Sequence, residues 1–440
     1  MATLLPEEII ADILSRVPTK SVMRFRCVCK PWCRLTSEST FIETHFNRSI
    51  EKQGYEKCEN LNLFLASKPD FIMKNVKSTT TYTDGREDSF GDGTLNLTRT
   101  HMYSVVEDEA VEIENPLEPC FHETLVLGSC NGLICLYTWN RLCLLNPATR
   151  EYKKFNFIGG FDSKNIIYGF GYSSVDDVYK VIYIVPKYDT DEDYNYSEFN
   201  IFPVSETTPP MSGHVGLKFL NKKESGILLN ETLHWAVMDN YNDYARVFSF
   251  CLRDNVGKEV PRPNNVKKKA KISIGVLGGQ LCLLSKFSTS DTEIWVMKNY
   301  GESNSWTKLF EIEGYFIPSI PISRPYSHYG ITDKYLLNMK PLYFAKNGEV
   351  LITNGRDLVL YNPLWKGARN LEIHGITDQT NTGKVVTYIA SLVTLKSGTY
   401  AREEKQADDK WRNLRVRIQQ YGSTSAGSVD ESISLVCDKP

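Results

Sequence analysis

Over residues 5 to 47, apolar side chains recur three and four positions apart, which is the spacing of one helical face. The first helix begins at Leu5-Pro6-Glu7-Glu8, because proline and acidic residues suit a first turn. Pro18 ends this helix, Thr19 is placed to cap the second, and Pro31 separates a third. The pattern predicts about three short helices, with apolar positions at Ile9, Ile10, Ile13, Leu14, Val17, Val22, Met23, Phe25, Val28, Trp32, Leu35, Phe41, Ile42 and Phe46.

A unit of this size has too little core to be stable without further support. Its apolar positions also exceed what three short helices can bury among themselves. We therefore expect part of this apolar surface to face a partner.

From about residue 55 the pattern changes to short apolar runs separated by Gly, Asn, Asp and Pro, which is typical of strands and turns. The clearest runs are Leu61–Leu65, Leu133–Tyr137, Lys180–Ile184 and Glu349–Ile352. The 24 tyrosines and 20 phenylalanines agree with a mainly β chain. Longer loops are expected at 79–100, 187–214 and 253–271.

Two kinds of segment repeat within the β region. An apolar strand followed by Asn-Pro occurs at Leu142–Pro147 and again at Leu358–Pro363. A turn followed by an apolar strand begins at Asn131-Gly132, Asn230-Glu231, Gly278-Gly279 and Asn347-Gly348. Their spacing suits four-stranded blades of about 40 to 50 residues, which predicts a β-propeller. A β-sandwich is the rival fold.

Composition narrows the class of protein. The 440 residues are too many for one ordinary core, so two units or one large repeat unit are expected, and a net charge of −2 gives no reason to expect nucleic-acid binding. The N-terminus does not read as a secretory signal, and no stretch is long and apolar enough for a membrane helix. We expect a cytoplasmic or nuclear protein whose eleven cysteines are reduced.

The N-terminal residues resemble an F-box nearly position for position, from Leu5-Pro6-Glu7-Glu8-Ile9-Ile10 through Val17-Pro18-Thr19-Lys20 to Cys27-Val28-Cys29-Lys30-Pro31-Trp32. The remainder resembles the F-box-associated, kelch-like β-propeller domain of plant F-box proteins. The segments that carry this second resemblance are Gly128–Leu136, Leu145–Tyr152, Tyr168–Tyr172, Leu233-His234-Trp235 and Ile294–Lys298. The layout is also that of the S-locus F-box subgroup.

These resemblances divide the chain into an F-box domain at 1–48, a connecting segment with first propeller strands at 49–119, the associated propeller at 120–396 and a charged tail at 397–440. The propeller is expected to begin near residue 55. The tail is expected to be partly disordered.

The resemblance implies a non-catalytic receptor subunit of a Skp–cullin–F-box ubiquitin ligase. Its F-box would bind a Skp-type adaptor, which bridges to a cullin, and its β domain would bind a target protein. The implied adaptor contacts are Leu5, Pro6, Ile9, Ile13, Leu14, Val22, Phe25, Val28 and Trp32. Ile10, Val17 and Leu35 are expected to pack inside the F-box instead.

An acidic and aromatic segment could grip a basic target through Tyr188, Asp191, Asp193, Tyr194 and Tyr196. A solvated loop is the plain alternative. A calcium loop is disfavoured, because Tyr194 stands where glycine is needed.

The remaining candidate sites favour packing over chemistry. Cys27, Cys29 and Cys33 lack a fourth metal ligand and are expected to be buried, like Cys130, Cys135 and Cys143. Lys267–Lys271 could be a nuclear signal but reads better as a solvated turn. Gly169-Phe170-Gly171 lacks the context of a dinucleotide site and reads as a tight strand entry.

His234, Trp295 and Trp306 are expected in the core. No HExxH or GxSxG motif occurs, so no cofactor, metal or catalytic residue is assigned. A propeller enzyme or a glycan-binding lectin fused to an F-box is the alternative from another class.

Overall fold

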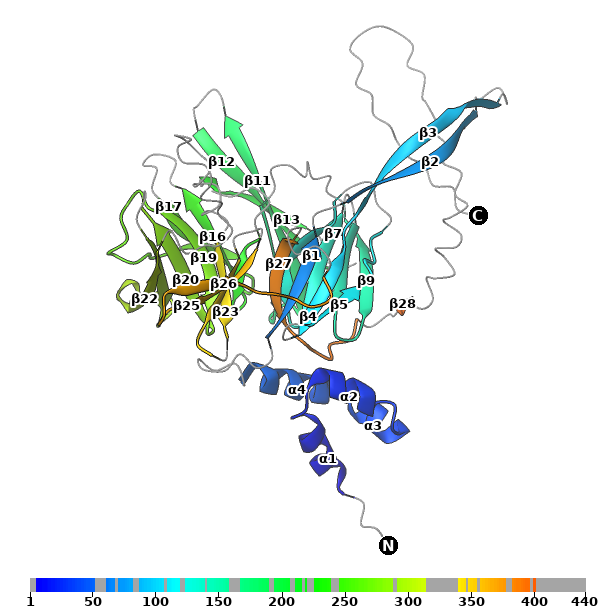
Figure 1. Ribbon diagram of the computed structural model, residues 1–440, viewed down its shortest axis with the longest axis horizontal. Helices are drawn as coiled ribbons and strands as arrows, with labels where there is room; N and C mark the ends of the chain where they lie inside the picture. The colour runs from blue at the N-terminus through cyan, green and yellow to red at the C-terminus, as the bar shows by residue number, and fades with distance from the viewer. Residues whose placement is uncertain are drawn as a thin grey trace.

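The computed structural model shows a helical unit at one end of a larger β-propeller (Figure 1). None of the helices it describes is long and apolar enough to cross a membrane. The described residues are 5–51, 61–67, 70–81, 87–106, 109–118, 123–138, 141–157, 167–189, 194–205, 210–215, 218–219, 225–238, 245–287, 291–313, 339–345, 347–353, 357–376, 382–395 and 399–400.

The helical unit, residues 5–51, contains the four helices α1 (Glu7–Leu14), α2 (Thr19–Phe25), α3 (Lys30–Leu35) and α4 (Ser39–Glu51). The sequence pattern predicted about three. The difference is that Phe41, Ile42 and Phe46 belong to a helix of their own, the 13-residue α4.

A proline precedes each of the first two helices, as expected for Pro6, whereas Pro18 was expected to end the first helix, which ends earlier, at Leu14. Pro6 and Pro18 occupy the position just before α1 and α2, where their missing N–H costs no helical hydrogen bond. The prediction that Thr19 caps α2 is wrong, because Thr19 is already the first helical residue. Its buried hydroxyl donates instead to the carbonyl of Ala390, at 3.0 Å, in a distant part of the chain.

The described strands form six antiparallel blades, which confirms the propeller and excludes the sandwich. Blade 1 holds β27 (Thr382–Ile389), β1 (Leu61–Ser67), β4 (Met102–Val106) and β5 (Glu109–Ile113). Blade 2 holds β6 (Leu125–Cys130), β7 (Leu133–Thr138), β8 (Arg141–Asn146) and β9 (Glu151–Asn156). Blade 3 holds β10 (Ile167–Ser173), β11 (Val178–Asp189), β12 (Tyr194–Pro203) and β13 (Met211–Val215).

Blade 4 holds β14 (Lys218–Phe219), β15 (Ile227–Leu229), β16 (Thr232–Met238), β17 (Ala245–Cys251) and β18 (Val256–Val260). Blade 5 holds β19 (Lys271–Leu277), β20 (Gln280–Lys286), β21 (Thr292–Met297) and β22 (Trp306–Ile312), with a 3-10 turn at Ser303–Ser305. Blade 6 holds β23 (Lys340–Phe344), β24 (Val350–Thr353), β25 (Leu358–Asn362) and β26 (Gly367–Asn370). A two-residue strand, β28 (Thr399–Tyr400), pairs with the outer edge of β9; the rest of the expected tail lies outside the described residues.

The ring is closed by the two ends of the domain. β27 pairs with β1 in an antiparallel register that sets Leu61 opposite Ile389 and Leu65 opposite Val385. The first blade therefore combines one strand from the end of the domain with three from its beginning. This shared blade closes the ring, because it joins the two ends of the propeller domain through one sheet.

The repeated segments occupy equivalent places in their blades. The four turn-and-strand segments join β6 to β7, β15 to β16, β19 to β20 and β23 to β24, and the two Asn-Pro segments end β8 and β25; in blade 4, β14 and β15 both pair with β16 and together take the place of a first strand. Asn131 and Gly132 have φ of 52° and 80°, and Gly278 and Gly279 have φ of 56° and 72°. Such pairs of positive φ fit the tight hairpin turns that match strand twist. The weak internal similarity thus reflects a real repeat.

Antiparallel order gives the propeller two distinct sides. Turns between first and second strands lie on the side of the helical unit, and connections between second and third strands lie on the other. Two long hairpins extend from this other side: β11–β12, and a hairpin of β2 (Asp70–Thr81) and β3 (Glu87–Arg99) inserted between β1 and β4 (Figure 1). The loops expected at 79–100 and 187–214 are thus largely strands, because threonine-rich and aromatic segments favour extended pairing. Within 253–271, residues 256–260 form β18.

Neighbouring blades pack closely through the first strand of blade 3. Gly169 lies inside β10, and a Cβ there would stand 2.7 Å from Leu233 Cδ1 and 2.9 Å from the indole of Trp235 in blade 4. Gly171 meets Leu252 in the same way. The expected tight strand entry at 169–171 is therefore the interior of a strand, where glycine lets two blades approach.

Candidate functional site

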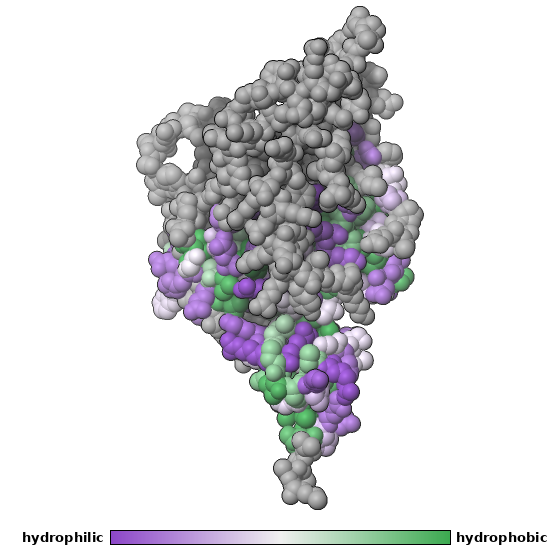
Figure 2. Space-filling view, turned by 90° about the vertical axis from the view of Figure 1, so that its right-hand side faces the viewer, coloured by the Kyte–Doolittle hydropathy of each residue, from purple (hydrophilic) through white to green (hydrophobic). Residues whose placement is uncertain are grey.

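The helical unit exposes a row of apolar side chains. Ile9 and Ile13 lie one helical turn apart on α1, and Leu5 lies just before this helix; the three side chains are 56% (Leu5), 46% (Ile9) and 49% (Ile13) exposed. Val28, in the turn between α2 and α3, is 63% exposed. Figure 2 shows apolar surface at this end of the molecule. Exposed apolar side chains on one small unit make this surface the candidate site for a protein partner.

The other implied contact residues lie deeper. Leu14 and Val22 are buried in the helical core with Leu35 and Phe41, so they support the surface and do not form it. Phe25 and Trp32 are half-buried, with their rings edge to face and their centroids 5.8 Å apart. Pro6 is exposed, and Ile10 and Val17 pack, partly buried, against the same core.

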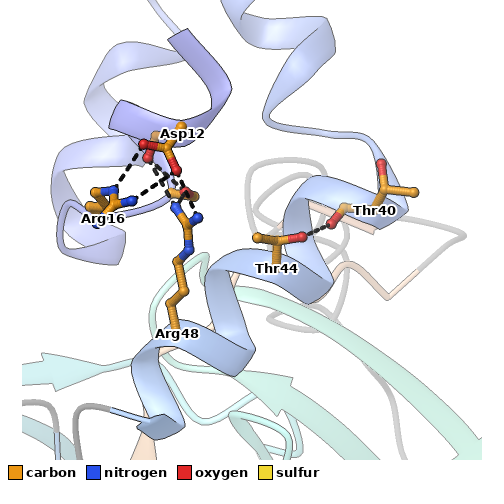
Figure 3. A network of polar contacts seen from close by, with 6 residues as sticks. Asp12, Arg16, Thr40, Thr44 and Arg48 are labelled. Carbon is orange, nitrogen blue, oxygen red and sulfur yellow. Dashed lines mark hydrogen bonds and ion pairs between the residues drawn. The ribbon is translucent and has the colours of Figure 1, made fainter. Parts of the chain in front are cut away.

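A polar network fixes α1 against α4 (Figure 3). The Arg16 Nε and Arg48 Nη2 atoms lie 3.0 and 2.7 Å from the carboxylate oxygens of Asp12. Hydrogen bonds from Arg16 and then from Arg48 lower the pKa of Asp12. His45, buried on α4, lies with its Nε2 2.9 Å from the carbonyl of Val17, just beyond α1. The exposed row on α1 is thereby held in one orientation.

The three cysteines of the helical unit depart from the prediction. Cys27, Cys29 and Cys33 are all exposed, whereas burial was expected. The reason is that Phe25, Trp32 and Leu35 already fill the core-facing side of α2 and α3. No group of three metal-binding side chains occurs among the described residues, here or elsewhere.

The cysteines of blade 2 lie where the strand pattern predicted. Cys130, Cys135 and Cys143 are buried in β6, β7 and β8. Burial raises the pKa of the Cys130 thiol to about 12, so this thiol stays protonated at neutral pH. These residues serve packing.

The proposed target-binding segment lies at the tip of the β11–β12 hairpin. Tyr188 pairs with Asn195, and Asp189 pairs with Tyr194, so Tyr188, Tyr194 and Tyr196 all lie on strands. Asp191 and Asp193, which join these strands, lie outside the described residues. The hairpin stands on the side of the propeller opposite the helical unit (Figure 1).

The other residues singled out from the sequence are either buried in the propeller or lie in an exposed turn. His234 is fully buried, with its Nε2 2.6 Å from the hydroxyl of Tyr300, and burial lowers its pKa to about 4. Trp295 and Trp306 are buried in the core of blades 4 and 5, as predicted. Lys267 lies in an exposed turn, with its ammonium 4.2 Å above the ring of Phe287.

Two known protein families match the two parts of this structure. Residues 96–395 match the F-box associated beta propeller domain, and residues 3–43 match the F-box domain. The chain belongs to this family of F-box proteins. The helical unit is thus the F-box, and its exposed α1 row lies within the matched residues.

Similar curated proteins come from Arabidopsis thaliana. The F-box protein CPR1 is 27% identical over 71% of this chain and 74% of its own length. An F-box/kelch-repeat protein is 27% identical over 81% of this chain and 87% of its own length. A further F-box protein is 26% identical over 86% of this chain and 89% of its own length. The similarity thus extends over most of this chain and most of each relative.

One functional feature escaped the sequence analysis. Leu392, three residues after β27, is fully buried in the core of the F-box. The local signal was only an apolar run at 392–395 that reads as one more strand. Nothing local connects it with helices almost 370 residues earlier.

Proposed function

We propose that this protein is the substrate-receptor subunit of a Skp–cullin–F-box ubiquitin ligase. The observation that carries the proposal is the exposed row of Leu5, Ile9 and Ile13 on an F-box whose own core is already filled by Leu14 and Val22. Apolar side chains left half-exposed on a rigid helix gain free energy when a partner covers them. That partner is a Skp-type adaptor, which carries the cullin.

Val28, Phe25 and Trp32 extend this surface beyond α1. The edge-to-face ring pair is half-buried, so both rings keep area that an adaptor can cover. Large aromatic side chains are the common anchors of such interfaces. Leu14 and Val22 contribute by holding the surface in shape.

The two sides of the propeller suit a receptor. The F-box lies on one side, and the β2–β3 and β11–β12 hairpins extend from the other (Figure 1). A target bound between or upon these hairpins would be held away from the adaptor, with its own surface free for ubiquitin transfer. The protein would contribute proximity, and a separate subunit would perform the chemistry, in the cytoplasm or nucleus.

Co-purification with a purified plant Skp-type adaptor tests this function. The wild-type chain should form a stable complex, and Leu5→Ala with Pro6→Ala should lose it. The matched control is Leu364→Ala with Trp365→Ala, because these residues are 86% and 83% exposed on a propeller turn outside the F-box. The control should bind the adaptor like the wild type.

The folded wild type failing to bind any adaptor would overturn the proposal. In that case the propeller is to be studied as a binding protein in its own right. Equal loss of binding in both variants would show that the result reflects exposed apolar area in general and not the F-box row.

A further inference from the structure

Residues 390–395, which we call the strap, follow β27 and run between the F-box and blade 2. Leu392 projects into the helical core, where it is fully buried beside Leu14, Val22, Leu35 and Phe41. The Thr19 hydroxyl of α2 donates to the carbonyl of Ala390 at 3.0 Å. The F-box core is therefore completed by a side chain from the far end of the propeller domain.

The other contacts of the strap lie in the propeller. The buried Ser391 donates from its Oγ to the carbonyl of Asn131 at 2.9 Å. The buried Asn146 amide donates to the carbonyls of Ser391 and Val393 at 3.1 and 2.8 Å. Leu395 is buried in the core shared by blades 2 and 3. Alternate strap residues thus hold the F-box on one side and the propeller on the other.

The turn at Gly132 shows how closely the strap is seated. Gly132 has φ of +80°, and a Cβ there would stand 2.2 Å from Ser391 Oγ and 2.7 Å from the carbonyl oxygen of Ile389. No side chain fits between this turn and the strap. A change in the propeller turn would therefore displace the strap and, through it, Leu392.

We propose that the strap is a positioning element for adaptor binding, which completes the F-box core only when β27 has closed the propeller ring. Four short helices with a small core depend strongly on one additional buried leucine. Adaptor affinity then depends on how much of the F-box is folded, because affinity falls in proportion to the competent fraction. The adaptor part of this inference rests on the proposed function.

The decisive variant changes the propeller and no F-box residue. Gly132→Ala should displace the strap, whereas Gly348→Ala is the matched control. Gly348 also follows an asparagine in a turn between first and second strands, and its φ is +81°, but it has open space around it. Both variants carry the same backbone strain, and only one disturbs the strap.

Two measurements on the full chain separate the possible results. Gly132→Ala should bind the adaptor at least roughly tenfold more weakly than Gly348→Ala, as expected if the competent fraction falls to about a tenth. Hydrogen exchange in α1 to α4 should also become faster in Gly132→Ala alone, in the absence of adaptor. The exchange measurement tests the strap even if the wild type binds no adaptor. Absence of adaptor binding by the wild type would refute only the proposed function.

A second pair guards against general destabilisation by the glycine variant. Leu392→Ala should speed exchange in the helices, and Leu392→Met, which keeps the volume, should restore wild-type exchange. Helices that exchange at wild-type rates in both Gly132→Ala and Leu392→Ala would overturn the inference.

Discussion

Replacing Ile9 and Ile13 with alanine tests the adaptor surface most directly. The two side chains lie one turn apart on α1 and are 46% and 49% exposed. Full burial of an isoleucine contributes about 1.5–3 kcal/mol, so covering the exposed half contributes roughly half of that. Since alanine keeps one methyl group, the double variant should lose about 1–3 kcal/mol of binding, or roughly 5- to 150-fold in affinity.

The same substitutions should leave the free chain stable. Only about half of each side chain is covered in the free chain, and the small loss of that contact is partly offset because alanine has a higher helix propensity than isoleucine. The matched control is Leu14→Ala on the same helix, where the side chain is buried in the core. That change should cost about 2–5 kcal/mol and unfold the F-box.

Titration calorimetry against the purified adaptor, with thermal unfolding of each free variant, distinguishes the two roles. The double variant should bind weakly and melt like the wild type, and Leu14→Ala should melt earlier. Wild-type affinity in the double variant would refute the assignment of α1 as the docking face. An early melt would instead show that α1 packs against more of the chain than its exposure indicates.

Three further predictions concern single sites. Phe25→Ala or Trp32→Ala should each weaken adaptor binding by about 2 kcal/mol or more, because large aromatic side chains at an interface act as anchors. The same titration measures this loss, and a folded variant with unchanged affinity would contradict the prediction. Since burial lowers the pKa of His234 to about 4 from 6.5, the unfolded chain binds more protons between these values. The free energy of unfolding should rise by up to about 3 kcal/mol as pH rises through that window, and urea titrations of His234→Gln should lack this slope. Leu364→Ser and Trp365→Ser should each change stability by no more than about 0.5 kcal/mol, since both side chains are almost fully exposed; a larger loss in denaturant melts would reveal a contact of this turn.

Local patterns accounted for the two-part architecture. Prolines at 6 and 18, with apolar residues at helical spacing, located α1 and α2, and the turns at Asn131-Gly132 and Gly278-Gly279 located the first hairpins of their blades. These features depend on interactions within a few residues, so they can be read from the sequence. Family resemblance added which residues belong to the F-box.

The sequence could not distinguish neighbouring apolar residues by role. Ile13 and Leu14 are adjacent and similar, yet one is half-exposed and the other buried, because only Leu14 turns toward α2 and the strap. The exposed cysteines show the same limit: Cys27 and Cys33 lie outside because aromatic side chains already occupy the interior.

The sequence by itself determined the positions of α1 and α2 and the short hairpins at which four of the blades begin, since each follows from spacing and turn chemistry over short distances. The tertiary structure alone decided that Leu392 completes the F-box and that the long hairpins stand on the opposite side. The contacts between the strap and the F-box join residues about 370 positions apart, such as Thr19 and Ala390. Periodicity shows which apolar side chains are to be buried, and only the closed ring of blades determines which distant segment buries them.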